Sequence, residues 1–279
     1  MRSAAGRACV EAAEAGAGIV RRAHRARAER AFGVDLKGPI DLVTAVDHAA
    51  ETAIVECLQR LQPSVPILAE ERGMVGGSKA GCRFIVDPLD GTTNFAHGFP
   101  VFAVSIGYEE DGEVVAGAVL DPLREELFTA EAGRGAHLNG VPIRVSPTAE
   151  MQHALLATGF PYSSEAMDRA LDLFVRIMRR VRAVRRAGSA ALDLCCVAAG
   201  RLDAFWEETL RAWDTAAGEV IVREAGGLVS DFDGGPFSNG GPNIAVSNGA
   251  LHPALLEILA EARAGGRPEA SAVSSGSGR

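Results

Sequence analysis

The segment Asp87-Pro-Leu-Asp-Gly-Thr-Thr-Asn-Phe95 places two carboxylates three residues apart, directly behind the apolar run Phe84–Val86. Because such a run predicts a buried strand, we expect Asp87 to project from the strand's C-terminal end, where α/β proteins usually bind ligands. Pro88 stiffens the turn, so Asp90 can return its carboxylate to the same side. Two carboxylates fixed in this way suit a hard divalent cation with oxygen ligands.

The residues after Asp90 suggest that a phosphate group could bind beside the cation. Gly91, Thr92 and Thr93 offer backbone N–H groups, and a helix that starts there would attract a phosphate group. The alternative is an aspartate-rich turn closed by side-chain-to-backbone hydrogen bonds, with no ligand. The segment favours the metal but leaves both interpretations open.

Three further acids follow or precede other predicted elements. Glu70 comes directly after the apolar run Pro66–Ala69, which predicts another buried strand. Asp214 precedes a predicted helix, where it suits an N-cap as well as a ligand, since a cap residue keeps one oxygen free. Glu207 ends a predicted strand, and by themselves Glu207 and Glu70 are explained as solvated acids.

Two local patterns also have structural explanations. Thr44 and Asp47, three residues apart, have the spacing of a helix capping pair. Gly188 and Ser189 have the composition of a helix start, with Ser189 as the N-cap. On their residues alone, both patterns favour these structural roles.

The elements that must position these residues fall into two styles. The first 140 residues predict two helices, over residues 1–30 and Thr44–Leu61. They also predict an antiparallel meander over Val101–Ala130, with a hairpin turn at Asp111-Gly112. Two glycine-rich loops are predicted at Gly73–Gly81 and Gly133–Gly140. Residues 141–265 alternate strands and helices, which is typical of an α/β half. We therefore divide the chain into an α+β half (1–140), an α/β half (141–265) and a small, polar tail (266–279) predicted to be disordered.

Composition excludes several classes of protein. With 47% apolar and 23% charged residues among 279, the chain can bury a sizeable core. The net charge of −8 disfavours direct binding of nucleic acid. The N-terminus lacks the uninterrupted apolar run of a signal peptide, and no run is long enough to span a membrane. The five cysteines lack metal-finger spacing and are predicted to be reduced. These features and the lack of a signal peptide pattern predict a cytoplasmic protein.

One basic stretch stands out in this acidic chain. Residues Arg179–Arg186 carry five arginines and alternate like a strand, with Val181 and Val184 predicted to point inward. We interpret the stretch as a solvated sheet edge or as a contact in a homodimer.

The motif Asp87–Phe95 resembles the signature of the inositol monophosphatase family, and Trp213–Gly218 resembles the second signature of that family. Phe102–Gly107 and Gly188–Leu192 are similar to family segments in the same order, and the resemblance runs from about residue 5 to residue 262. On these motifs the chain is identified as a member of the family. The resemblance implies a layered α/β/α/β/α fold and a lithium-sensitive phosphatase that uses two or three Mg²⁺ ions.

The resemblance also assigns roles to individual residues. It implies metal ligands at Glu70, Asp87, the carbonyl of Leu89, Asp90 and Asp214. It implies that Asp47 and Thr92 polarise the attacking water, with Glu70 as a further catalytic residue. The implied substrate contacts are Asp90, Gly91, Thr92, Gly188, Ser189, Ala190, Glu207 and Asp214. One departure is Lys37, which precedes Asp41 by four residues, where the family's lysine precedes its aspartate by five.

We therefore expect a Mg²⁺-dependent phosphomonoesterase that acts on inositol-1-phosphate or a related polyol or sugar monophosphate. Two alternatives stay open. One is a sister activity on histidinol phosphate, fructose-1,6-bisphosphate or a 3′-phosphoadenosine nucleotide. The other is a regulatory, protein-binding role with residual phosphatase activity.

Overall fold

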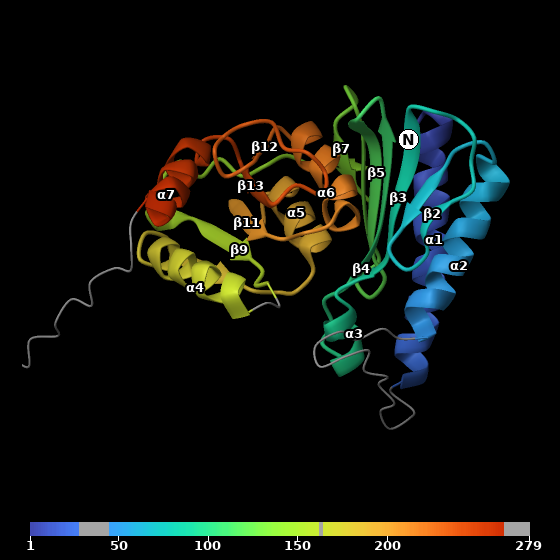
Figure 1. Ribbon diagram of the computed structural model, residues 1–279, viewed down its shortest axis with the longest axis horizontal. Coiled ribbons are helices and arrows are strands. Elements are labelled where there is room, and N and C mark those ends of the chain that lie inside the picture. Colours follow the sequence, from blue (N-terminus) through green and yellow to red (C-terminus); the bar gives the residue numbers. More distant parts are fainter. Residues whose placement is uncertain (28–44, 162–163, 265–279) are drawn as a thin grey trace, which may run out of the picture.

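The computed structural model describes residues 1–27, 45–161 and 164–264, and its helices and sheets alternate in layers (Figure 1). Helices α1 (Ala4–Arg27) and α2 (Ala45–Leu61) cover the outer face of an eight-stranded sheet. Helices α5 (Ala190–Ala198) and α6 (Ala212–Glu224) lie between that sheet and a five-stranded sheet, whose far face carries α4 (Ser164–Met178) and α7 (His252–Ala264). This is the predicted α/β/α/β/α fold, so the prediction is confirmed.

The first sheet has the strand order β2-β1-β3-β4-β5-β6-β7-β8. The strands are β1 (Ile67–Ala69), β2 (Gly73–Val75), β3 (Cys82–Asp90), β4 (Ala103–Glu110), β5 (Glu113–Asp121), β6 (Glu126–Glu131), β7 (Ala136–Leu138) and β8 (Val141–Pro142). Among the described strands of this sheet, only β1 and β3 are parallel neighbours, and β3 pairs antiparallel with β4. Strands β4 to β6 form the meander predicted over Val101–Ala130. Its hairpin turns at Asp111 and Gly112, which both have positive φ (52° and 85°) as a two-residue turn of this kind requires.

Two of the predicted loops contain strands. The segments Gly73–Gly81 and Gly133–Gly140 include β2 and β7, each three residues long. Strand β2 pairs with β1, and β7 lies between β6 and β8, with Ala136 and Leu138 packed against the core. Glycine content therefore wrongly predicted loops throughout these two segments, because three-residue strands are too short to show the pattern by which a strand is recognised.

The second sheet has the order β10-β9-β11-β13-β12. Its strands are β9 (Leu155–Thr158), β10 (Ala183–Arg185), β11 (Ala204–Glu208), β12 (Leu228–Ser230) and β13 (Asn243–Ser247). The arginine-rich stretch supplies the edge strand β10, and Val181 and Val184 pack against the core as predicted. The domain boundary near residue 140 stays a prediction, and the tail 266–279 lies outside the described residues.

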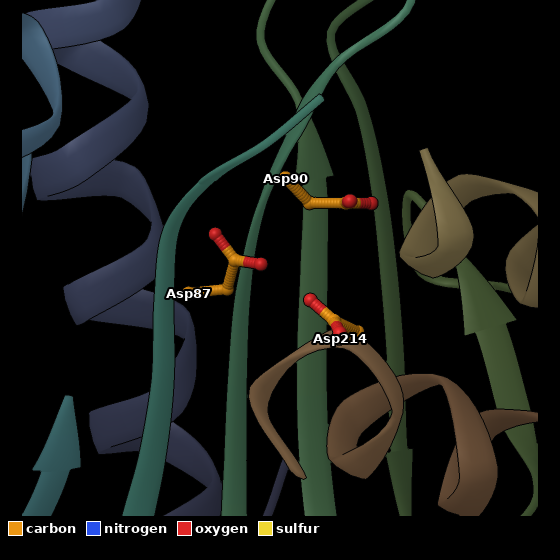
Figure 2. Close-up of side chains that lie close together, drawn as sticks. All are labelled: Asp87, Asp90 and Asp214. Carbon is orange, nitrogen blue, oxygen red and sulfur yellow. The ribbon is translucent and has the colours of Figure 1, made fainter. Parts of the chain in front are cut away.

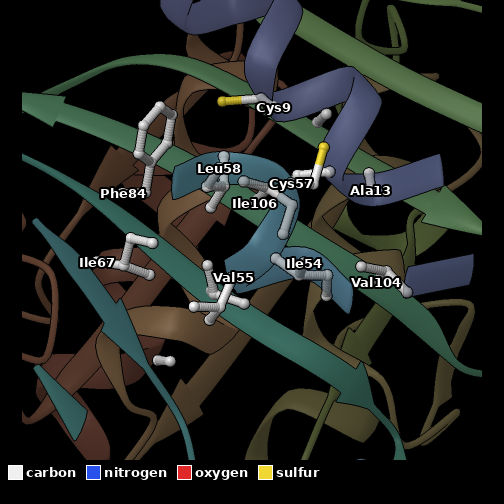
Figure 3. Packing of buried hydrophobic residues seen from close by; sticks show 14 of the residues in the cluster. Cys9, Ala13, Ile54, Val55, Cys57, Leu58, Ile67, Phe84, Val104 and Ile106 are labelled. Atoms are coloured by element: carbon white, nitrogen blue, oxygen red, sulfur yellow. The ribbon is translucent and has the colours of Figure 1, made fainter. Parts of the chain in front are cut away.

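The outer core lies between the first two helices and the first sheet (Figure 3). On the face of α1 that packs on the core, Ala13, Ala17 and Val20 are fully buried and Val10 is partly buried. All five cysteines are free, and four of them are buried, as expected of core thiols. Within the described part of the chain, no helix combines the length and the apolar character that a membrane crossing requires.

Small residues bring α6 close to the first sheet. A side-chain carbon added at Gly107 would lie 2.9 Å from Cβ of Ala216, and one added at Gly117 would lie 2.9 Å from Cα of Ala217. Only glycine in β4 and β5 therefore permits this approach of the helix. The contact places the N-terminal turn of α6, which contains Asp214, over the end of β3.

Candidate metal centre and active site

Glu70 and Asp87 come together because β1 and β3 are parallel and in register. Ala69 pairs with Val86, so the next residue of each strand lies at the same edge of the sheet. The backbone N–H of Glu70 also donates to the carbonyl of Val86 at 3.2 Å. Pairing of the two apolar runs is therefore sufficient to align these two acids.

Asp90 lies close to Asp87 because β3 is irregular between them. We predicted that the strand ends before Asp87, but β3 continues to Asp90, with a shift in its pairing to β4 between the two aspartates. The N–H of Leu89 donates to Oδ1 of Asp87 at 2.9 Å. The aspartate turn proposed as an alternative to a metal is thus present, yet it uses only one oxygen of Asp87.

Asp214 completes an acidic cluster from the opposite side. One carboxylate oxygen from each of Asp87, Asp90 and Asp214 lies within 4.8 Å of the other two, and Figure 2 shows the three side chains around a common space. Asp214 is not the N-cap of α6, as one interpretation had it. It lies in the first turn, and its Oδ2 accepts a hydrogen bond of 2.6 Å from the N–H of Arg211, the residue before the helix.

The electrostatics of the cluster favour a cation. Burial raises the pKa of Glu70 to about 8 and that of Asp214 to about 7, and neighbouring carboxylates add to both shifts. Burial raises the pKa of Asp90 to about 6, and burial together with Glu70 raises that of Asp87 well above its usual range. Arg211 lowers the pKa of Asp214, but burial outweighs it. A divalent cation with oxygen ligands fits this set, since it would offset the mutual repulsion of the carboxylates.

The raised pKa values make the stability of the metal-free protein depend on pH. A carboxyl group whose pKa is higher in the folded than in the unfolded chain stabilises the fold below its unfolded pKa, and this contribution is lost as the pH rises through the folded pKa. For Glu70, Asp90 and Asp214 the window runs from about pH 4 to about pH 8. We expect the melting temperature in EDTA to fall across this window, and Mg²⁺ to raise it more at about pH 8 than at about pH 5.

Thermal melting with and without Mg²⁺ at both pH values tests this expectation. The variant Asp214→Asn serves as the control, because it removes one of the groups and should reduce the dependence on pH. Equal stabilisation by Mg²⁺ at the two pH values would contradict a site made of these carboxylates.

Thr92 and Asp47 are in contact beside the cluster. Thr92 is the first residue of α3 (Thr92–His97), and its hydroxyl lies 3.3 Å from Oδ1 of Asp47 and 3.0 Å from the carbonyl oxygen of Leu89, so it can donate to either. Asp47 lies in the first turn of α2 and is 2% exposed. Its predicted capping partner Thr44, like Lys37 and Asp41, lies outside the described residues.

The turn from Gly188 to Ala190 packs against the cluster. Ser189 is the N-cap of α5, as its sequence context predicted, and accepts a hydrogen bond from the N–H of Leu192. Its hydroxyl also donates to Oδ2 of Asp90, which accepts a second hydrogen bond of 2.8 Å from the N–H of Ala191. Asp90 is therefore tied to the turn that carries the proposed substrate residues.

Asn94 connects α3 to the same turn before α5, and the sequence analysis did not identify it as a site residue. Its amide nitrogen lies 2.7, 2.8 and 3.3 Å from the carbonyl oxygens of Val101, Ala187 and Gly188, and so links the turn before α5 to the end of α3. The asparagine stands inside the Asp87–Phe95 motif, but an uncharged amide gives no chemical signal of its own in a sequence.

Glu207 is not a freely solvated acid. It lies partly buried in β11, and its pKa is raised well above the usual range, first by burial and then by the carboxylates of Asp193 and Asp214. Arg186, which follows the edge strand β10, lowers this pKa. The sequence analysis also missed Asp193, which is 5% exposed in the first turn of α5 and whose acidic side chain was hidden in an otherwise apolar helix.

Known proteins share this arrangement of elements. A sequence model described as the inositol monophosphatase family matches residues 4–264. A Pseudomonas aeruginosa protein named Nus factor SuhB is 46% identical over 233 residues, 82% of this chain and 86% of that protein. An inositol-1-monophosphatase of Mesorhizobium japonicum is 45% identical over 227 residues, 81% of this chain and 85% of that protein. The solved structure of extragenic suppressor protein suhB from Bartonella henselae has a TM-score of 0.86 at 42% identity, covering 92% of this chain and 98% of that chain.

Proposed function

The chain belongs to the inositol monophosphatase family and is a phosphoric monoester hydrolase of that type, and we propose that it hydrolyses inositol-1-phosphate or a related polyol or sugar monophosphate with the help of Mg²⁺. The observation that carries this proposal is the cluster of Asp87, Asp90 and Asp214, whose oxygens lie within 4.8 Å of one another. Glu70 and the carbonyl of Leu89 would complete the ligands of two or three ions. Mg²⁺ held there supplies a Lewis acid for the phosphoryl and leaving oxygens and lowers the pKa of water.

The chain's own residues would handle the proton of the attacking water. Thr92 can accept a hydrogen bond from water while its own hydroxyl proton points to Asp47. As the water oxygen attacks phosphorus, its proton would pass to Oγ1 of Thr92 and the threonine proton to Oδ1 of Asp47. The ester bond to the leaving oxygen breaks in the same displacement, and the departing alkoxide takes a proton from solvent water, so that an alcohol is released.

The remaining proposed residues would recognise the rest of the substrate. The N–H groups of Gly91 and Thr92 would donate to the phosphoryl oxygens, and the turn Gly188–Ala190, held against Asp90 through the hydroxyl of Ser189, would contact the rest of the substrate. Glu207 would accept hydrogen bonds from substrate hydroxyls, because an ionised carboxylate is an acceptor only.

Phosphate release from a panel of monoesters tests the proposal. We expect Mg²⁺-dependent hydrolysis of inositol-1-phosphate that lithium and excess Ca²⁺ inhibit, since the longer and looser coordination of Ca²⁺ would spoil the alignment of the displacement. Histidinol phosphate, fructose-1,6-bisphosphate and 3′-phosphoadenosine nucleotides serve as the competing substrates. Full activity in EDTA would contradict the metal mechanism, and a preference for a competing ester would move the substrate assignment to that class.

A second candidate function is a regulatory, protein-binding role, which the relatives named Nus factor SuhB favour. We also propose that the protein is cytoplasmic and forms a homodimer whose contact includes the arginine-rich edge at β10. The net charge of −8 disfavours direct binding of nucleic acid. Light scattering of the wild type and of an Arg182→Glu variant tests the dimer.

A further inference from the structure

The carboxylate of Glu207 lies directly against a glycine of the neighbouring strand. Gly159 follows β9, which runs parallel to β11 with Thr158 paired to Trp206. A side-chain carbon built on Gly159 would lie 2.0 Å from Oε1 of Glu207 and 2.2 Å from its Oε2. No carbon atom fits at these distances, so the carboxylate occupies the space that any other residue at position 159 would need.

The backbone does not explain the glycine. Gly159 is not one of the residues with positive φ, so an L-amino acid could adopt its conformation without strain. Its surroundings are fixed, because the hydroxyl of Thr158 donates to the carbonyl of Trp206 at 2.7 Å and holds the two strands together. Glycine at position 159 therefore leaves space for the Glu207 carboxylate, and the backbone conformation does not require it.

We propose that Gly159 is a specificity-determining positioning residue, which lets the Glu207 carboxylate lie where it can accept hydrogen bonds from the hydroxyls of a polyol phosphate. This inference rests on the proposed function. The carboxylate is the far end of a flexible side chain, whereas Gly159 belongs to a buried strand end. A methyl group at position 159 would thus displace the carboxylate rather than the strands, and the fold would persist.

The variant Gly159→Ala tests the inference by comparing two substrates. We expect kcat/KM for inositol-1-phosphate to fall by about 10- to 100-fold, mostly through a higher KM, as for the loss of a hydrogen bond to a charged group. For p-nitrophenyl phosphate, which lacks the hydroxyls, the loss should be much smaller. The melting temperature should stay close to that of the wild type.

A double-mutant cycle and a matched glycine sharpen the test. Glu207→Ala removes the displaced group, so adding Gly159→Ala to it should cost no further activity. Gly6→Ala is the matched control, because a carbon added at Gly6 in α1 would lie 2.8 Å from a carboxylate oxygen of Glu131, outside the candidate site. This control should keep wild-type kinetics on both substrates.

The outcomes separate this inference from the proposed function. An active wild type whose Gly159→Ala variant keeps full kcat/KM on inositol-1-phosphate would overturn the inference alone. Equal losses on both substrates, or additive losses in the double mutant, would also overturn it, since Gly159 would then act through the fold. A wild type that releases no phosphate from any polyol ester would instead contradict the proposed function.

Discussion

Replacement of Asp87 by asparagine should abolish turnover and weaken the binding of Mg²⁺. Asp87 is a proposed metal ligand, and it is 2% exposed, with the carboxylates of Glu70 and Asp90 close enough to raise its pKa. Asparagine keeps an oxygen that can accept the hydrogen bond from Leu89, so the turn should persist while the charge is lost. Because a bound cation contributes several kcal/mol of charge stabilisation to the transition state, we expect kcat to fall by at least about 10³-fold. Steady-state kinetics and titration calorimetry with Mg²⁺ measure the two effects.

Asp121 provides a matched control for this substitution. It is also 2% exposed at the end of a strand, and its Oδ1 accepts a hydrogen bond of 2.9 Å from the N–H two residues ahead, at Leu123. Asp121 lies outside the acidic cluster, where it pairs with Arg124. Asp121→Asn should therefore cost some stability but leave kcat and Mg²⁺ affinity close to wild type. Unchanged Mg²⁺ affinity in Asp87→Asn would contradict its role as a metal ligand.

Local sequence patterns predicted the fold where the pattern is strong. The strands β1 and β3 were predicted from two apolar runs that both end in acids, whereas their parallel register, which places Glu70 beside Asp87, comes from the structure. The same patterns missed β2 and β7, since each of these strands has only three residues and lies in a glycine-rich segment. The bulge after Asp87 also had no local signal, because it depends on how β3 meets β4.

The candidate site was predicted less from patterns than from resemblance. Asp214 is far from Asp87 in the sequence, and only the packing of α6 on the glycines of β4 and β5 brings the two together. Gly159 and Asn94 could not be identified beforehand for a related reason. An absent side chain and an uncharged amide gain a role only from what lies next to them in space, which no spacing along the chain reveals.

The closely spaced carboxylates link the two proposed parts of the mechanism, which are metal binding and activation of the attacking water. Asp47 contributes to the raised pKa of Glu70, so the water-activating pair and the metal ligands share one electrostatic environment. Asp47 is also within reach of Thr92. A water between Glu70 and Thr92 would therefore have a metal ligand on one side and the proton-accepting pair Thr92 and Asp47 on the other. Mutation of one side at a time separates the effect on metal binding from the effect on proton transfer.

Asp47→Asn should lower kcat by about 10²- to 10⁴-fold, the contribution typical of a general base, while KM and Mg²⁺ affinity change little. Asparagine can still accept the hydrogen bond from Thr92, but it cannot take up the proton that the displacement releases. Thr92→Ala should show a similar loss, because the proton would then lack its path to Asp47. The double mutant should be little worse than either single variant, as residues that act as one unit are not additive.

The alternative role of Asp47 predicts a different result for the same variants. If Asp47 only stabilises the start of α2, asparagine should cost a few tenths of a kcal/mol of stability, about what exchange between good capping residues costs, and kcat should barely change. Kinetics, Mg²⁺ dependence and melting of the three variants distinguish the two roles. Near-normal kcat in Asp47→Asn would leave activation of the water to the bound cation alone. A fall in kcat with unchanged melting temperature and Mg²⁺ affinity would place the proton on the Thr92–Asp47 pair.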